Sequence, residues 1–311
     1  DDTSTVRVCW FFHAPLGFVI TGFGALLALI AAPLDNYWHE LYGIDIALWA
    51  PFHMMGVTGG LIGILGMIYV FAAEAAIERQ LGYSRRRLWG LCSPEWGALL
   101  VIASLMNFTL TGFLQFPIAT IGPLSISTYP LPLVTSATFC FMGATHLTRR
   151  PGVAISLVLV LLLNTLAIEL FIPWAIRSAV AAQGLAYRTP GKVPYFSWAY
   201  ALLPLVYLIP ALVVDGTTFW SQRRHRQTGN TARSAGIIGA VITPPIILTA
   251  PFILQSYSTY AAIFLPQPRL PVPPMLWVIA GLLFALVVLG VGVLGAVLGV
   301  DFGFIWRYNA R

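Results

Sequence analysis

Three side chains near the start of the chain have the types and the spacing of a metal site. Asp35 and His39 are four residues apart, so on a helix their side chains lie on the same face. His53 follows Pro51, a residue favoured at the first position of a helix, and we expect it in the first turn of a second helix. One carboxylate and two imidazoles are a sufficient ligand set for copper or zinc. They leave a coordination position open for water, oxygen or a substrate.

Two further acids lie in the same segment. Glu40 and Asp45 stand between the two histidines, where each could be an extra ligand or a partner that fixes a histidine tautomer. An alternative explanation needs no metal: aromatic residues would anchor the segment at the depth of the lipid headgroups while the charged residues face water. These aromatics are Tyr37, Trp38, Tyr42 and Trp49. We favour the metal site because residues 35–53 hold two of the five histidines and three of the eleven acids.

The composition predicts that membrane helices position this segment. Of the 311 residues, 58% are hydrophobic and only 9% are charged, far from the usage of a soluble domain. A hydrocarbon core about 30 Å thick needs roughly 20 apolar residues per helix. The fold class we expect is all-α: a polytopic integral membrane helix bundle with about eight transmembrane helices in a single domain, 1–311. The expected spans are about 8–34, 47–77, 97–121, 127–147, 151–176, 198–220, 235–255 and 275–300.

Basic residues divide unequally between the loops that connect these spans. Of the 17 lysines and arginines, 13 fall on the side of the N-terminus. The opposite side holds only Arg177, Arg188, Lys192 and Arg269. The positive-inside rule therefore puts both termini in the cytoplasm and residues 35–53 on the outer face, which is periplasmic in a prokaryotic plasma membrane. The net charge of +6 thus reflects the orientation of the chain in the membrane. We expect a lipid bilayer as its partner and no nucleic acid.

Glycines and prolines indicate how the helices pack. Gly56 and Gly60 in the second span, and Gly295 and Gly299 in the last, are spaced to let another helix backbone approach closely. Pro244-Pro245 is expected to interrupt the seventh span.

The segment from Asp35 to His53 resembles the metal-binding segment in the C subunit of the copper membrane monooxygenases, the particulate methane and ammonia monooxygenases. The shared order is Asp35, three residues, His39, then Asp45, then Pro51-Phe52-His53, with Trp38 directly before the first histidine. The resemblance implies that Asp35, His39 and His53 bind copper, and that Asp45 matches an acidic position of the same segment. It also implies that the chain works with other membrane subunits. No histidine of an expected outer loop follows His53, so the resemblance transfers one metal site.

Other polar residues within the expected spans are further candidates. Glu169 is functional by default, because an acid in lipid is costly. It could lie beside the metal as a second-shell partner, or it could pair with Arg177 or Arg188 in the bundle. His13 and His146 could ligate a haem or serve as hydrogen-bonded packing residues. The three cysteines, Cys9, Cys92 and Cys140, share no metal-site spacing, and we expect no disulfide framework.

Three functions are compatible with these features. The first is a copper-binding subunit of a membrane oxidoreductase, with zinc as the alternative ion, that activates oxygen or peroxide for a small apolar substrate arriving through the bilayer. The second is a transporter, motivated by Pro244-Pro245 and Glu169, although the repeats or paired broken helices that transporters use are not seen in the sequence. The third is a non-catalytic structural subunit of a respiratory or photosynthetic membrane complex.

Overall fold

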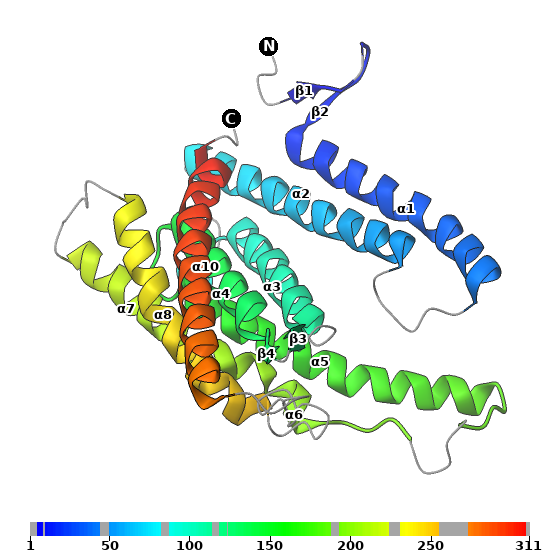
Figure 1. Ribbon diagram of the computed structural model, residues 1–311. Helices are drawn as coiled ribbons and strands as arrows, with labels where there is room; N and C mark the ends of the chain where they lie inside the picture. The colour runs from blue at the N-terminus through cyan, green and yellow to red at the C-terminus, as the bar shows by residue number, and fades with distance from the viewer. Residues whose placement is uncertain are drawn as a thin grey trace.

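The chain forms a bundle of long helices with two short β-hairpins (Figure 1). The computed structural model describes residues 5–8, 10–43, 50–81, 87–113, 118–122, 124–187, 193–223, 231–254 and 273–308. The helices are α1 (Leu16–Tyr42), α2 (Pro51–Leu81), α3 (Ser93–Phe113), α4 (Pro130–Thr148), α5 (Val153–Ala182), α6 (Trp198–Ala201), the 3-10 helix η1 (Leu203–Tyr207), α7 (Leu208–Arg223), α8 (Thr231–Leu254) and α10 (Pro274–Tyr308). The strands are β1 (Thr5–Arg7), β2 (His13–Pro15), β3 (Ile118–Ile121) and β4 (Leu124–Ser127). The prediction of an all-α bundle is confirmed.

Six helical segments in the described residues are long and apolar enough to cross a membrane, which identifies an integral membrane protein. They are α1, α2, α5, η1 together with α7, α8 and α10. Helices α3 and α4 stand where the third and fourth spans were expected but are not among these six. Fourteen of the 19 residues of α4 are buried against other helices, among them Ser136 and Thr138. A helix enclosed by protein in this way can carry polar residues that a lipid-facing helix cannot.

The first helix begins later than the expected start of the first span near residue 8. Strands β1 and β2 pair antiparallel, with Val6 opposite Ala14, and α1 starts at Leu16. Pro15 has φ −57° and ψ 138°, an extended conformation that separates the hairpin from the helix. The helix then continues to Tyr42, so Asp35 lies inside it and not beyond its end.

The expected break at Pro244-Pro245 is also wrong. Helix α8 runs through both prolines and packs along α10. Each proline removes one backbone hydrogen bond, and packing on α10 holds the helix axis despite this loss. The interrupted helix is instead the sixth expected span, which divides into α6, η1 and α7.

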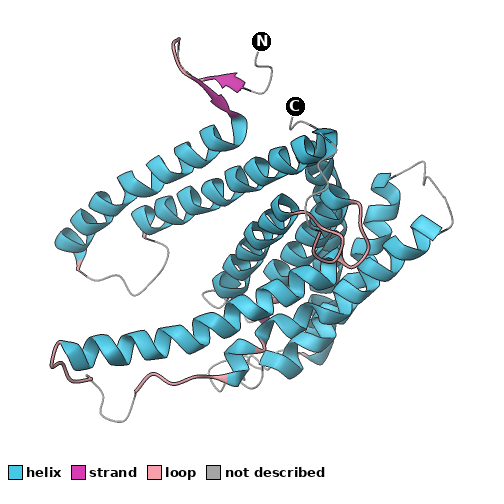
Figure 2. Cartoon of the chain, turned by 180° about the vertical axis from the view of Figure 1, so that it is seen from behind, coloured by secondary structure: helices cyan, strands magenta, loops and turns pink. Residues whose placement is uncertain are grey.

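Helices α1 and α2 are antiparallel and lie side by side in both views (Figure 2). Their seam consists of small residues seven positions apart: Gly17, Gly24 and Ala31 on α1, and Gly59 and Gly66 on α2. A Cβ added at Gly24 would lie 2.4 Å from the backbone nitrogen of Gly63, and one at Gly66 would lie 2.4 Å from the backbone nitrogen of Thr21. Backbone therefore touches backbone at these positions. The predicted Gly56 and Gly60 pair is not this contact, because a Cβ at Gly60 would meet nothing within 4 Å.

The predicted close packing at Gly295 and Gly299 is confirmed. A Cβ at Gly295 would lie 2.3 Å from the Thr138 hydroxyl, and one at Gly299 would lie 2.5 Å from the Phe139 carbonyl oxygen. Helix α10 thus packs on α4, and the buried core forms around α4.

Asp215 on α7 has a structural role that the sequence did not indicate. Its carboxylate is 5% exposed and accepts hydrogen bonds from the backbone N–H groups of Ala154, at 3.2 Å, and Ile155, at 2.8 Å. These donors belong to the first turn of α5, where helical N–H groups have no partner in their own helix. Asp215 therefore caps α5 from another helix and places a negative charge at the positive end of its dipole.

The α1–α2 seam predicts opposite effects for two substitutions on one helix. Gly24→Ala places a methyl group against the backbone of α2 and should destabilise the pair by about 1–3 kcal/mol. Gly22→Ala is the matched control, since its Cβ meets nothing within 4 Å and alanine favours a helix by up to about 1 kcal/mol. Thermal unfolding of both variants in detergent measures the difference. Equal melting temperatures for the two would contradict the seam.

Candidate metal centre

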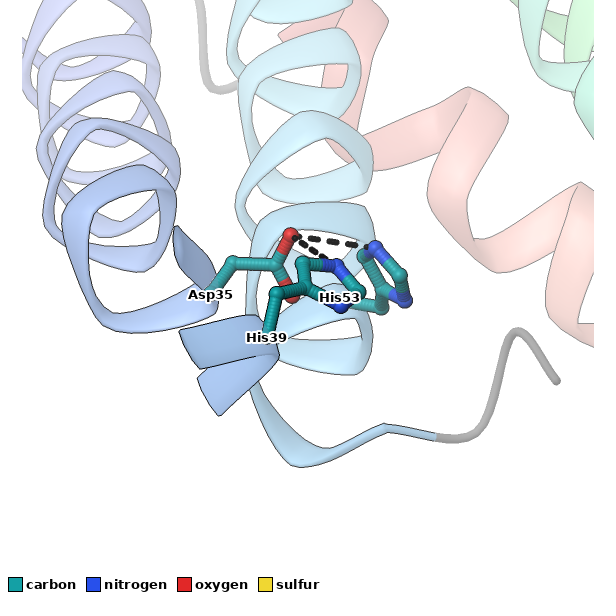
Figure 3. A group of neighbouring side chains, drawn as sticks. All are labelled: Asp35, His39 and His53. Carbon is teal, nitrogen blue, oxygen red and sulfur yellow. Dashed lines mark ion pairs between the residues drawn. The ribbon is translucent and has the colours of Figure 1, made fainter. Parts of the chain in front are cut away.

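The end of α1 and the beginning of α2 bring three predicted ligands together. Asp35 and His39 lie one turn apart near the end of α1, and His53 lies in the first turn of α2. Figure 3 shows the three side chains turned toward one another across the gap between the helices. These are the residues that the sequence predicted, and one ligand atom from each lies within 4.8 Å of the other two.

Two of the three separations between the candidate ligand atoms are close to those around one metal ion. His39 Nε2 is 3.4 Å from Asp35 Oδ2, and His53 Nε2 is 3.1 Å from the same oxygen. In a tetrahedral site with bonds of 2.0–2.1 Å, neighbouring ligand atoms are roughly 3.3 Å apart. The two imidazole rings are tilted by 58° with centroids 5.4 Å apart, so they do not stack. An ion of the size of zinc or copper can therefore lie between the two nitrogens and the carboxylate with little movement.

The backbone at the end of α1 fixes the tautomer of His39. Its Nδ1 is 3.1 Å from the carbonyl oxygen of Gly43, which can only accept a hydrogen bond. Nδ1 must therefore carry the proton and donate it, and in the neutral ring Nε2 then has a free lone pair. That lone pair faces the Asp35 carboxylate, where only a proton or a cation between them makes the contact favourable. Metal-binding histidines are held in this way, with the other ring nitrogen bonded to a carbonyl or carboxylate.

Gly43 was not predicted as part of the site. Its φ of +83° is a conformation that glycine adopts freely, and it ends α1 while its carbonyl oxygen turns back toward His39. A glycine four residues after a candidate ligand is the signal that could have identified it, because glycine is common where a helix ends.

Two polar atoms of the site are buried without a partner. Among the residues that the structure describes, neither Asp35 Oδ1 nor His53 Nδ1 has a hydrogen-bond partner.

The side chains as a whole are partly exposed: 21% at Asp35, 28% at His39 and 32% at His53. The group is thus partly accessible from outside the protein, as a site that exchanges its ion or meets a small molecule must be. Asp45, the predicted additional acid, lies outside the described residues.

Aromatic residues hold the two helix ends together behind the ligands. Trp38 packs on Tyr42 with ring centroids 4.5 Å apart, and it meets Phe52 of α2 edge-on at 6.0 Å. Trp38 and Tyr42, two residues of the aromatic belt considered as the alternative, thus lie at the same helix end as Asp35 and His39, and Trp49 lies outside the described residues. Trp38 bridges the helices while its neighbour His39 faces the site.

Glu40 and Glu169, the described acids that were predicted to support the ligands, make their contacts elsewhere. Glu40 accepts a hydrogen bond from the Asn36 side chain at 3.0 Å on an exposed face of α1. Glu169 on α5 lines a pocket of about 590 Å³ together with Pro173, Tyr195 and Ser197. None of the three metal ligands lines that pocket, so the structure does not bring Glu169 to them. Arg177, one predicted partner of Glu169, donates instead to the Pro173 carbonyl oxygen, and Arg188 lies outside the described residues.

The remaining candidates do not form a second centre in the described part of the chain. Cys92 and Cys140 are both free and buried, and burial raises the pKa of the Cys92 thiol to about 11, so this group is neutral and a poor metal ligand. His13 lies in β2, and His146 lies on α4 with its ring against Phe304 and Nδ1 at 2.9 Å from the Met142 carbonyl oxygen. A haem site would need His13 and His146 on two helices at matched depth, but His13 lies in a β-hairpin.

Comparisons of the chain with protein-family models, with curated protein sequences and with solved structures find no match.

The role of Gly43 can be tested without changing a ligand. Gly43→Ala strains a backbone with positive φ and should move the carbonyl oxygen away from His39, which lowers metal affinity by about 10–100-fold, as losses of such outer partners do. Titration of the purified protein with a metal ion measures the affinity. Gly22→Ala is the control, and an unchanged affinity in Gly43→Ala would show that the carbonyl does not orient His39.

Proposed function

We propose that the protein binds one transition-metal ion at Asp35, His39 and His53. The observation that carries this proposal is the convergence of two imidazole nitrogens on one carboxylate oxygen, with the proton of His39 already committed to Gly43. Without a cation, only protonation of His39 would make its contact with the Asp35 carboxylate favourable. A surface belt of polar residues would not require three side chains from two helices to converge.

Copper is the ion that we propose, with zinc as the alternative. Two imidazoles and a carboxylate suit both, and the general order of affinities places divalent copper above zinc for a site of this kind. The resemblance to the C subunit of copper membrane monooxygenases supports the same choice. When bound, copper would supply one-electron redox chemistry with oxygen or peroxide at the open coordination position. The protein side chains hold the ion, fix the His39 tautomer and leave one face accessible.

On this basis we propose that the chain is a metal-binding subunit of a membrane oxidoreductase complex. A small apolar substrate would reach the site through the bilayer, since the ligands lie at the end of two apolar helices. The outer half of α5 supports the presence of partner subunits. It extends away from the other helices (Figure 1) and exposes Leu170, Phe171 and Trp174, each by more than half. The same feature is compatible with a structural subunit without catalysis.

The proposed topology has eight spans. Helices α3 and α4 would cross the membrane with the six apolar segments, which gives both termini the same side. Hairpin β1–β2 and the C-terminal end of α10 do lie at one end of the molecule, in support of this arrangement (Figure 1). The basic residues near that end support a cytoplasmic location, and the metal site would then face the periplasm of a prokaryotic plasma membrane.

Metal content tests the proposed function directly. The purified protein should contain about one equivalent of copper per chain, and Asp35→Asn or His53→Ala should remove most of it because each takes away one of three ligands. Elemental analysis of protein loaded with equal copper and zinc measures both amount and identity.

Two matched controls separate ligand loss from general disturbance. Glu40→Gln changes an acid next to His39 whose side chain bonds to Asn36 on the exposed face of α1. His13→Ala removes a histidine of the hairpin. Both should keep the full metal content. Metal bound equally by all four variants would rule out the site, and zinc or iron in place of copper would rule out the proposed ion while leaving the ligands intact.

A further inference from the structure

A second polar pocket lies at the end of α2 away from the metal ligands. It has a volume of about 160 Å³ and is formed by the end of α2, the 87–92 turn, the start of α3 and the ends of α4 and α10. Figure 1 shows the ends of α2 and α10 next to each other at the same end of the molecule as hairpin β1–β2. The charged residues that line it are Glu78, Arg79, Arg87, Glu95, Arg150 and Arg307.

The charges of this pocket do not balance. Four arginines face two glutamates, an excess of two positive charges in one small space. Glu95 is already engaged: it pairs with Arg79 at 3.3 Å and accepts the backbone N–H of Cys92 at 3.0 Å, which caps the start of α3. Within the described residues, Arg79 Nη2 is buried without a hydrogen-bond partner. Four positive groups around one small pocket repel one another, and an anion would provide the counter-charge that offsets this repulsion.

Two of the arginines, Arg150 and Arg307, are held in place by contacts with other segments of the chain. A tight turn at Trp89 and Gly90, both with positive φ, joins the bridged residues Leu88 and Leu91. Arg150 lies directly against this turn, since a Cβ added at Gly90 would meet its Nη1 at 2.6 Å. Arg307 donates to the carbonyl oxygen of Leu147 at the end of α4. The four arginines that line the pocket thus come from four separate segments: the end of α2, the 87–92 turn, the turn after α4 and the end of α10.

The position of the pocket along α2 indicates which kind of anion it binds. His53 and Arg79 are 26 residues apart on one helix. At 1.5 Å per residue the distance is about 39 Å, close to the 40–45 Å thickness of a bilayer with its headgroups. If one end of α2 lies at one membrane surface, the pocket lies at headgroup depth on the other. Basic pockets between helices at this depth bind phosphate-bearing lipid headgroups.

We infer that this pocket binds a phosphate group at the membrane surface. A phospholipid headgroup or a soluble phosphate ester can supply that group, and guanidinium groups match its oxygens with paired hydrogen bonds. The proposal uses none of the metal ligands and does not depend on the metal site. It does rest on the helices crossing the membrane.

Lipid titration of the full chain in detergent tests the inference. Native mass spectrometry counts the molecules of phosphatidylglycerol or phosphatidylcholine retained at each lipid concentration, and a parallel arm replaces lipid with inorganic phosphate and follows the melting temperature. Phosphatidylglycerol should be retained in preference to phosphatidylcholine. Arg150→Gln and Arg87→Gln should each weaken its retention about fivefold, the effect of one basic residue at a membrane surface.

Arg223→Gln is the matched control. Arg223 ends α7, stacks over Phe219 at 4.2 Å and does not line the pocket, so its loss removes the same charge elsewhere. Its lipid retention should stay within twofold of the parent. Stabilisation by inorganic phosphate but not by lipid, lost in Arg150→Gln, would assign a soluble ester as the source. Equal retention in all three variants, or no preference for the anionic lipid and no effect of phosphate, would overturn the proposal.

Discussion

The close approach of α1 and α2 is the constraint that brings Asp35, His39 and His53 together. In lipid there is no hydrophobic gain from bringing two apolar helices together, so their association rests on packing contacts between surfaces that fit. Here the fit comes from small residues at seven-residue intervals, which let backbone meet backbone near Gly24 and Gly66. Because the helices are antiparallel, the same seam that sets their separation also sets how far the last turn of α1 lies from the first turn of α2. The positions of Asp35, His39 and His53 follow from that separation.

The charged residues at the two ends of α2 match the direction of its helix dipole. The Asp35 carboxylate lies against the first turn of α2, where the helix dipole is positive, and Arg79 lies in the last turn, where it is negative. A single helix thus links a carboxylate and histidine group at one end with an arginine-rich pocket at the other.

Local spacing predicted that Asp35, His39 and His53 come together because the two helix ends that carry them are close in the sequence. A separation of four residues places Asp35 and His39 on one face of any helix, and Pro51 marks where the next helix begins. The hairpin at residues 5–15 was missed because its apolar residues resemble the start of a span, and strand pairing is decided by contacts that a hydropathy pattern does not contain. The break expected at Pro244-Pro245 was wrong for a related reason, since packing on α10 outweighs the loss of two backbone hydrogen bonds. Asp215 and Arg150 act on residues far from them in the sequence, and only the folded chain shows those partners.

Helix α1 packs almost entirely on α2 and shares little surface with the remaining helices, whereas α2 also contacts α3 and α10. A helix that shares few contacts with a core can open without unfolding that core, so we expect α1 to behave as a separate cooperative unit. An ion held by residues of both helices would join the last turn of α1 to the first turn of α2, so part of its binding energy would stabilise this unit. Loss of the ion would then appear first as faster amide exchange along α1, while α4 and α10 keep their protection.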